Sequence, residues 1–245
     1  MAKQPKLILR EACILDVTRD WPPGRFSEMG AGTGGMTRIF LERGFSGVAH
    51  DLGEDSRGLI RLSLQAYVDR ISVVDDIAAI PDESCDYLFA FEVLEHIQED
   101  REALVGWARQ LRCEGKVLVS VPAHMRKFGR SDEMVGHVRR YEKDELRRLL
   151  ESCGFTDIQI VNYGFPLTEL TRRLSNHMVK QDRSVDHLDP IERSIRSAQA
   201  KPRIINRALG LVGSRVFVPF RAVQRWFYRR DLGDGYVATA IKPAR

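Results

Sequence analysis

The sequence predicts an α/β fold in which helices cover both faces of a mostly parallel sheet. Its 245 residues, of which 43% are hydrophobic, can bury a sizeable core. From residue 26 onward, short apolar runs alternate with longer amphipathic segments, as in successive βαβ units. Acidic residues follow several of these runs, and ligands of parallel sheets bind beyond the carboxyl ends of the strands. A binding site is therefore expected at that edge of the sheet.

Seven short runs are predicted to be strands, each bounded by turn-forming or acidic residues. A glycine-rich loop follows the first run, Asp51 follows the second, and Asp75 and Asp76 follow the third. The last run follows the turn Gly233–Gly235. The predicted strands are Phe26–Met29, Gly47–His50, Ile71–Val74, Tyr87–Phe91, Lys116–Val121, Ile158–Val161 and Gly235–Ile241.

Four amphipathic segments between these runs are predicted to be helices. In the second of them, apolar residues recur at Leu59, Leu62, Ala66 and Tyr67, which is a helical spacing. The fourth is followed by Gly154, a residue suited to end a helix. The predicted helices are Met36–Arg43, Asp55–Asp69, Glu99–Leu111 and Lys143–Ser152.

The alternation of strands and helices divides the chain into four parts. Residues 1–25 form an N-terminal extension of mixed character that ends in the turn-rich WPPGR sequence. Residues 26–163 form the core of the fold, and residues 235–245 return to it as the last strand. Between them, residues 164–234 break the alternation and are interpreted as a basic helical insertion or lid.

This insertion mixes aromatic and basic residues and has no acidic residue between Glu192 and Asp231. Three interpretations are open. It packs on the sheet as a substrate lid, or residues 193–230 contact a membrane surface, because basic amphipathic segments with aromatic residues suit anionic lipid. The third interpretation is a contact with RNA.

The composition is that of a soluble globular protein. A net charge of +4 is too small to predict a nucleic-acid partner by itself. The four cysteines form no CxxC pair, so neither a zinc ribbon nor a thioredoxin-type site is predicted, and scattered cysteines fit a reducing cytoplasm. Arg10 and Glu11 interrupt the apolar N-terminal run, which predicts neither a signal peptide nor a membrane span. A cytoplasmic protein is expected, with peripheral membrane contact as an option.

The stretch FSEMGAGTGG, residues 26–35, places four of its glycines directly after a strand and an acidic residue. Glycines allow a sharp turn at positive φ and let a ligand approach the main chain. The GK[ST] ending of a phosphate-binding loop is missing. Gly35 completes a GxGxxG pattern from Gly30, so a dinucleotide site stays open as an alternative. Glu28 makes a dinucleotide site less favourable, because a carboxylate would repel a diphosphate.

The sequence EMGAGTG resembles motif I of the Rossmann-like methyltransferases that use S-adenosylmethionine. Further similarities follow in the order of that family: Asp51 after the second predicted strand, Asp76-Ile77 after the third, and FEVLEH, residues 91–96, after the fourth. The similarity covers roughly residues 26–163 and the last strand. It implies a three-layer sandwich around a mostly parallel, seven-stranded sheet, with the helical insertion before the last strand.

The resemblance also implies a cofactor site. The methionine part of the cofactor carries positive charge, so an acidic residue at the entrance of the loop is physically sensible. Asp51 would accept the ribose hydroxyls and Asp76 the adenine amino group, with the Ile77 backbone N–H on a ring nitrogen. The product would be S-adenosylhomocysteine. The cofactor-binding residues that the resemblance implies are Glu28, Gly30, Ala31, Gly32, Asp51, Leu52, Asp76, Ile77, Phe91 and Glu92.

Glu92, Glu95 and His96 have the spacing i, i+3, i+4, which places them on one face if a helical turn follows the fourth strand. His96, oriented by Glu95, is a candidate base for the acceptor's proton. A second hypothesis is a divalent cation held by these residues, because EVLEH is similar to a metal-binding segment of ubiquinone-pathway and small-RNA methyltransferases. His137, in GHVRRY, resembles another metal ligand of the RNA enzymes and completes the predicted catalytic set. Without a metal, Glu95 would cap a helix and His96 would pack inside.

In the same segment, Arg139 and Arg140 are candidates for binding an anionic substrate group, or form a solvated basic loop. Tyr141 is expected to pack under the loop. The preferred reading is methyl transfer to a small or lipid-linked acceptor, at oxygen. Rival readings are an RNA 2′-O-methyltransferase, an NAD-dependent oxidoreductase, and a non-catalytic binding module on the same fold.

Overall fold

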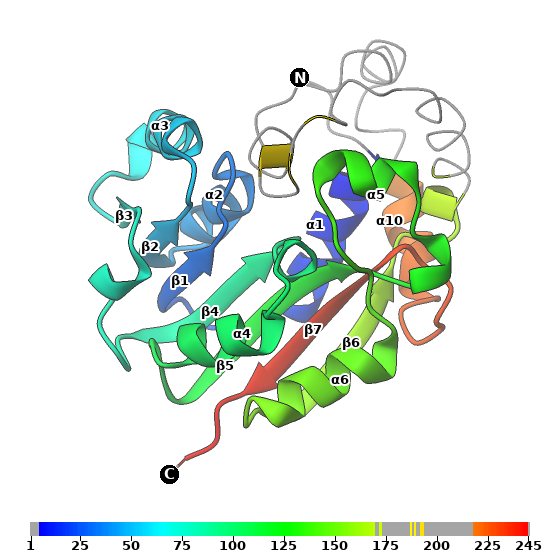
Figure 1. Cartoon of the computed structure of the whole chain (residues 1–245). Helices are drawn as coiled ribbons and strands as arrows, with labels where there is room; N and C mark the ends of the chain where they lie inside the picture. Colours follow the sequence, from blue (N-terminus) through cyan, green and yellow to red (C-terminus); the bar gives the residue numbers. More distant parts are fainter. Residues whose placement is uncertain are drawn as a thin grey trace.

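The computed structural model describes residues 5–169, 172, 187, 189, 192–193 and 218–244. It contains a seven-stranded sheet with the strand order β3-β2-β1-β4-β5-β7-β6 (Figure 1). The first five strands along the chain run parallel to one another, and β7 is antiparallel to both β5 and β6. The strands are β1 (Arg25–Met29), β2 (Ser46–His50), β3 (Ile71–Val74), β4 (Cys85–Phe91), β5 (Leu111–Pro122), β6 (Thr156–Tyr163) and β7 (Gly235–Ile241).

Helices connect most of these strands and lie on both faces of the sheet (Figure 1). The α-helices are α1 (Pro5–Val17), α2 (Gly35–Glu42), α3 (Glu54–Ser63), α4 (Asp100–Ala108), α5 (Arg130–Val135), α6 (Lys143–Ser152) and α10 (Val218–Arg225). Short 3₁₀ helices are η1 (Gln65–Tyr67), η2 (Ile77–Ala79), η3 (Leu94–His96) and η4 (Met125–Lys127). The seven-stranded α/β sandwich expected from the sequence is thus confirmed.

The core consists of two layers, because alternate residues of each strand point to opposite faces. On β4, Leu88 belongs to the layer that includes Trp107 of α4 and Leu146 of α6. Its neighbour Phe89 belongs to the opposite layer, with side chains from α1, α2 and α3. Phe89 stacks with Phe26 at 5.2 Å between ring centroids. Burial on both faces fixes the register of the sheet and therefore the position of each strand end.

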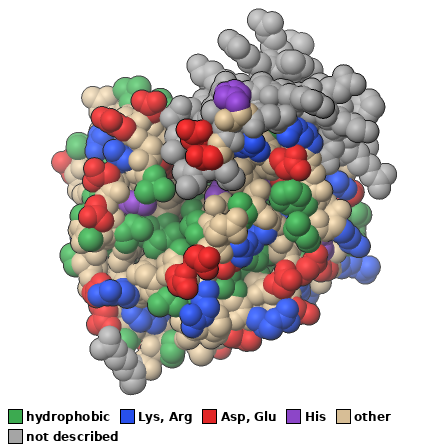
Figure 2. All heavy atoms as spheres, viewed as in Figure 1, with side chains coloured by type: hydrophobic (Ala, Val, Ile, Leu, Met, Phe, Trp, Pro, Cys, Tyr) green, Lys and Arg blue, Asp and Glu red, His purple; other side chains and the backbone are tan. Residues whose placement is uncertain are grey.

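The positions of four strand ends decide where a ligand can bind. Because β3, β2, β1 and β4 are adjacent and parallel, their carboxyl ends meet at one edge of the sheet. In the same view, Figure 2 shows hydrophobic side chains gathered near the middle of the face, bordered by charged side chains of both signs. The acidic residues predicted to follow these strands are therefore brought to one edge, as the sequence indicated.

The structure differs most from the sequence-based expectation in α1, α3 and β5. Residues 5–17, taken as part of a mixed extension, form helix α1, which packs against β6, β7 and α10. The helix expected over Asp55–Asp69 ends at Ser63, and η1 follows it. The strand expected to begin at Lys116 begins at Leu111, and the helix expected over Glu99–Leu111 accordingly ends at Ala108. The pairing of β5 with β4 shifts register between Cys85 and Tyr87.

Most of the predicted lid, residues 164–234, and of the basic stretch 193–230 lies outside the described residues. Its described end contains α10, where Gln224 Nε2 donates a hydrogen bond to the Leu9 carbonyl oxygen at 3.0 Å. Arg225 forms an ion pair with Asp16, so α10 is joined to α1 by contacts between segments far apart in the chain. Among the described residues, every helix is too short or too polar to cross a membrane.

Candidate active site

The glycine loop turns sharply between β1 and α2. Gly30, Gly32 and Gly34 have φ of 67°, 59° and 74°, in the left-handed region that favours glycine. A Cβ at Gly30 would lie 2.6 Å from Val93 Cγ2, so a side chain does not fit there. A Cβ at Gly32 would meet no atom within 4 Å, which leaves the face of the loop at Gly32 open to a ligand.

Glu28 precedes this loop and is buried at the end of β1, with 2% of its surface exposed. Among the described residues, its Oε2 atom has no hydrogen-bond partner. Burial raises the pKa of Glu28 to about 7, and the nearby Thr37 hydroxyl and the positive charge of Arg10 offset only part of this effect. A buried carboxyl group with an unpaired oxygen is a site for a positively charged donor, which would favour the ionised form.

Asp51 and Leu52 follow β2, next to the glycine loop. Asp51 Oδ2 accepts a hydrogen bond from the Gly32 N–H at 2.8 Å, and Oδ1 accepts one from the Gly53 N–H at 3.0 Å. The carboxylate therefore joins the two loops, and each oxygen keeps a lone pair for a further donor. Leu52 is 71% exposed, which is high for a leucine and provides an apolar surface beside that carboxylate.

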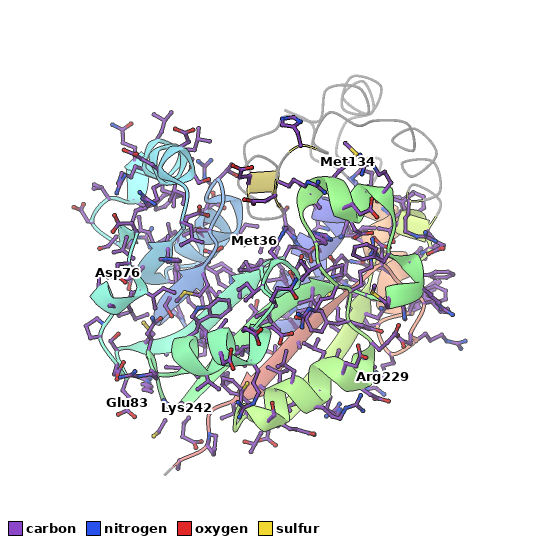
Figure 3. All side chains as sticks on the ribbon, in the orientation of Figure 1. Met36, Asp76, Glu83, Met134, Arg229 and Lys242 are labelled. Atoms are coloured by element: carbon purple, nitrogen blue, oxygen red, sulfur yellow. The ribbon has the colours of Figure 1, made fainter. Side chains whose placement is uncertain are left out.

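Asp76 and Ile77 follow β3, and Asp76 is exposed (Figure 3). One of its oxygens, Oδ1, accepts a hydrogen bond from the Ala78 N–H at 2.8 Å and so caps η2. Phe91 ends β4 and is buried. All residues proposed from the sequence to bind a cofactor thus lie at or just after the carboxyl ends of β1 to β4.

Glu92 follows β4 and is surrounded by donors. Its carboxylate lies 2.9 Å from Lys6 Nζ and 3.6 Å from Arg10 NH1, and it accepts a hydrogen bond from the Tyr163 hydroxyl at 3.2 Å. Burial disfavours the charged carboxylate, but Lys6 and Arg10 overcome this effect and hold the pKa of Glu92 below its usual range. Both cations come from α1. Because the sequence did not predict this helix, it did not predict that Lys6 and Arg10 reach Glu92.

Glu95, His96 and His137 form a second cluster beside Glu92. One nitrogen or oxygen atom from each lies within 4.8 Å of the others, and His137 Nε2 is 3.6 Å from Glu95 Oε1. Glu95 is fully buried, and neither of its oxygens has a hydrogen-bond partner within the described part of the chain. Burial and the nearby Glu92 carboxylate raise the pKa of Glu95 well above its usual value. This donor set could accept a proton or hold a divalent cation.

Hydrogen bonds fix the orientation of both imidazoles. His137 Nδ1 lies 2.8 Å from Asp132 Oδ1, and His96 Nδ1 lies 3.1 Å from the Gly136 carbonyl oxygen. Each ring is therefore left with Nε2 for other contacts. Burial and the neighbouring His137 lower the pKa of His96 to about 4, so His96 is neutral at pH 7. The carboxylate of Asp132 thus fixes which nitrogen of His137 faces the site.

The structure corrects the expectation that Glu92, Glu95 and His96 lie on one face of a helical turn. The segment after β4 is only a short 3₁₀ helix, Leu94–His96, and Glu92 precedes it with a φ of 57°. Glu92 therefore pairs with the cations of α1 instead of sharing a face with Glu95 and His96. Glu95 also contacts His137 and makes no hydrogen bond to His96. Asp132, which binds His137, was not singled out because the pair forms only in the folded loop.

Arg139 and Arg140 do not present free cations to a ligand. Arg140 lies between Asp132 at 2.9 Å and Asp234 at 3.2 Å, and its side chain is 5% exposed. Arg139 pairs with Asp100 at 2.8 Å. The expectations of an anion-binding pair and of a solvated basic loop are therefore wrong for Arg140, whereas Arg139 is paired but 29% exposed. Tyr141 is buried and donates a hydrogen bond to Asp100, so its expected packing under the loop is confirmed.

A family model described as methyltransferase domain matches residues 8–160. This range covers more than half of the chain and includes the glycine loop and the carboxylates after β2, β3 and β4. The chain belongs to the methyltransferase domain family. The match also includes most of α1, so the helix that carries Arg10 is part of the family's domain.

Curated relatives of this protein are named as S-adenosylmethionine-dependent methyltransferases. A probable S-adenosylmethionine-dependent methyltransferase of Mycobacterium tuberculosis is 33% identical over 81 residues, which is 32% of this chain and 30% of that protein. One from Mycolicibacterium smegmatis is 31% identical over 105 residues, or 41% of each chain. The aligned part thus spans less than half the length of these relatives.

Solved structures share the fold of this methyltransferase at low identity. Haemonchus contortus phosphoethanolamine N-methyltransferase 2, in complex with S-adenosyl-L-methionine, has a TM-score of 0.60 and 18% identity over 96% of this chain and 53% of that chain. A putative sarcosine dimethylglycine methyltransferase from Galdieria sulphuraria has a TM-score of 0.61 and 14% identity over 99% and 92% of the two chains. At such identity the likeness shows the fold alone.

Proposed function

We propose that the protein is an S-adenosylmethionine-dependent methyltransferase acting on a hydroxyl group of a small or lipid-linked acceptor. The observation that supports the cofactor most directly is the unpaired, buried Glu28 oxygen beside the open face of the glycine loop. A dinucleotide would bring a diphosphate to this carboxyl group, whereas the methionine end of S-adenosylmethionine brings an ammonium and a sulfonium. The electrostatics of the loop therefore favour S-adenosylmethionine over NAD.

Residues at the ends of different strands are proposed to bind different parts of the cofactor. Glu28 and the open backbone at Gly32 would hold its methionine part, and the free lone pairs of Asp51 would accept the ribose hydroxyls. Asp76 and the Ile77 N–H would meet the adenine ring, with the exposed Leu52 side chain packing nearby. Bound S-adenosylmethionine supplies an activated methyl group and a neutral thioether as the leaving group. The protein mainly orients the two reactants.

The cluster of Glu95, His96 and His137 is proposed to take up the proton that the acceptor loses. When the acceptor oxygen takes the methyl group, its hydroxyl proton would pass to an imidazole of this cluster. His137 is arranged to accept it, because Asp132 holds its Nδ1 and stabilises the imidazolium. His96 stays neutral beside it and positions the ring, at 4.8 Å between ring centroids.

The class of acceptor is proposed from one structural neighbour and from the exposed residues after α10. The structural neighbour from Haemonchus contortus is named for phosphoethanolamine, a small molecule, and a small acceptor is proposed here by analogy. Trp226, just after α10, is 79% exposed and is followed by Arg229 and Arg230. An exposed tryptophan beside cations suits a lipid headgroup surface, which supports a lipid-linked acceptor.

Two measurements test the proposal. Isothermal titration with S-adenosylhomocysteine and with NAD should give binding of the first alone. Transfer of tritium from methyl-labelled S-adenosylmethionine to a panel of phenols, polyprenyl-linked alcohols and RNA should label a hydroxyl compound. Binding of NAD without binding of S-adenosylhomocysteine would refute the assignment. Labelled RNA would change the proposed acceptor from a small or lipid-linked molecule to RNA. Cofactor binding without any labelled acceptor would favour a non-catalytic module.

A divalent metal in the same cluster is a second candidate, favoured by the unpaired Glu95 oxygens. We expect methyl transfer to survive dialysis against EDTA, because the imidazole of His137, held by Asp132, supplies a base without a metal. Elemental analysis of the purified protein checks the starting metal content. Activity that disappears on dialysis and returns with Mn²⁺ or Zn²⁺ would give the metal the role proposed for His137.

A further inference from the structure

His137 lies in the loop between α5 and α6, outside any helix or strand. Side-chain contacts therefore orient its imidazole: Nδ1 lies 2.8 Å from Asp132 Oδ1, and Nε2 lies 3.6 Å from Glu95 Oε1. The position of a base matters, because a displacement of about 1 Å can lower a rate by roughly a hundredfold. The groups that hold Asp132 in place therefore bear on methyl transfer.

Two other groups hold the Asp132 carboxylate. Its Oδ2 accepts a hydrogen bond from the Gly129 N–H at 2.9 Å, and its Oδ1 accepts one from Arg140 Nε, also at 2.9 Å. The side chains of Asp132 and Arg140 are 2% and 5% exposed, so this ion pair is shielded from water. Because a guanidinium is planar and rigid, the orientation of Arg140 determines where Asp132 can lie.

Arg140 is fixed in turn by residues at the edge of the sheet. Its NH1 donates hydrogen bonds to the Ala123 carbonyl oxygen and to Asp234 Oδ1, each at 3.2 Å. Ala123 follows β5 and Asp234 precedes β7, and the Ala123 N–H donates to the Asp234 carbonyl oxygen at 3.0 Å. The Asp234 N–H also donates to the Tyr163 carbonyl oxygen of β6. The strand ends therefore hold the Asp234 carboxylate at a fixed position.

The Asp234 carboxylate also faces two further cations. Lys6 Nζ of α1 lies 3.9 Å from its Oδ2, and Arg172 Nε lies 3.7 Å from its Oδ1. Both distances exceed that of a hydrogen bond, so Arg140 is the nearest of the three cations. A continuous series of buried contacts thus leads from the sheet through Asp234, Arg140 and Asp132 to the imidazole.

We propose that Arg140 and Asp234 are positioning residues for methyl transfer, which act through Asp132 to hold the His137 imidazole toward the acceptor. The inference rests on the proposed function, because it concerns the base assigned there. Neither Arg140 nor Asp234 has to contact the cofactor or the acceptor for this role. Their loss should therefore lower turnover and leave both affinities nearly unchanged.

Steady-state kinetics of single variants give the first test. Arg140→Lys keeps the positive charge, but an ammonium lacks the planar fork that contacts Asp132 and Asp234 together. We expect kcat to fall roughly 10- to 100-fold, with KM for the acceptor within about threefold of wild type. Asp234→Asn keeps the shape of the side chain without its charge, and kcat should fall about 3- to 10-fold. Arg139→Lys changes the neighbouring arginine, which pairs with Asp100, and is the matched control with kcat within about twofold of wild type.

Combining each variant with His137→Gln separates positioning from a purely structural role. If Arg140 and Asp234 act only through His137, either substitution should lower the kcat of His137→Gln by no more than about twofold further. Tritium transfer from methyl-labelled S-adenosylmethionine measures kcat of the single and double variants. Thermal melting and calorimetry with S-adenosylhomocysteine should show that each single variant folds and binds the cofactor within about threefold of wild type.

The outcomes separate this inference from the proposed function. Losses that multiply in the double variants would overturn the inference, because Arg140 and Asp234 would then act without His137. A raised KM at constant kcat, or no loss in either single variant, would also overturn it. Should Arg140→Lys fail to fold, the cycle of Asp234→Asn with His137→Gln decides in the same way. Wild-type protein that transfers no methyl group to any acceptor of the panel would refute the proposed function itself, and the inference with it.

Discussion

Replacing Glu28 with glutamine is expected to stabilise the ligand-free protein at pH 8 by about 3 kcal/mol and, at the same pH, to weaken its affinity for S-adenosylhomocysteine. Burial raises the pKa of Glu28 from 4.5 to about 7, so the folded state prefers the protonated group. Between these two values the folded protein binds more protons than the unfolded chain. Wild-type stability therefore falls as the pH rises through this window. Glutamine keeps the shape of the side chain without a charge and removes this pH dependence.

Cofactor affinity should respond to pH in the opposite direction. An ammonium bound to Glu28 favours the carboxylate, so the affinity of wild type should rise up to about tenfold per unit as the pH approaches 7, and then level off. For Glu28→Gln we expect affinity that does not depend on this titration and is roughly 10- to 100-fold weaker at pH 8.

Chemical denaturation between pH 5 and 8, and calorimetry at pH 6, 7 and 8, measure the two effects. Glu42→Gln changes an exposed glutamate at the end of α2 and serves as the control. Calorimetry in buffers of different ionisation enthalpy should also detect a proton released on binding below pH 7. Parallel stability curves for wild type and Glu28→Gln would contradict the raised pKa, and unchanged affinity would remove Glu28 from the site.

Elements with strong local signals were predictable from the sequence. Ile71–Val74, Gly235–Ile241 and Lys143–Ser152 have the bounds that the sequence predicted, because each lies between acidic residues, glycines or turns that stop it. The carboxylates after the strands were also found, because a strand end is a local feature. The parallel sheet then places them together without further information.

Helix α1 was not predictable in this way. Its first turn has no acidic residue, and its buried residues Ile8, Leu9, Ala12 and Cys13 alternate with charged ones in a short segment. Most of its stability comes from contacts with β6, β7 and α10, which lie more than a hundred residues away. Lys6 and Arg10 therefore reach the site through tertiary packing that no local pattern encodes.

The same reason explains why we propose His137 as the base, whereas the sequence pointed to His96. The sequence shows Glu95 and His96 as neighbours, and it cannot show that a loop after α5 brings His137 between Glu95 and Asp132. The contacts of His137 depend on Asp132, which is itself held by Arg140 and by the Gly129 N–H. Burial lowers the pKa of His96 because the ring loses water without gaining a carboxylate partner.

The variants Asp132→Asn and His137→Gln are each expected to lower turnover by roughly 10²- to 10⁴-fold, the usual contribution of a positioned acid or base. Asparagine can still fill the space behind His137, but it cannot stabilise the imidazolium as a carboxylate does. Methyl transfer to the best acceptor of the panel gives kcat and KM, and calorimetry with S-adenosylhomocysteine should show affinity within about threefold of wild type. Asp69→Asn, an exposed residue after η1, is the control.

The pH profile decides between the two histidines. If His96 were the base, kcat/KM would stay level on the acid side down to about pH 4, because only then would its ring become protonated. That profile, together with full activity in His137→Gln, would contradict the assignment and return the role to His96. A loss in kcat at constant KM for both Asp132→Asn and His137→Gln would instead show that the pair acts in the transition state, because a substrate-binding role would raise KM.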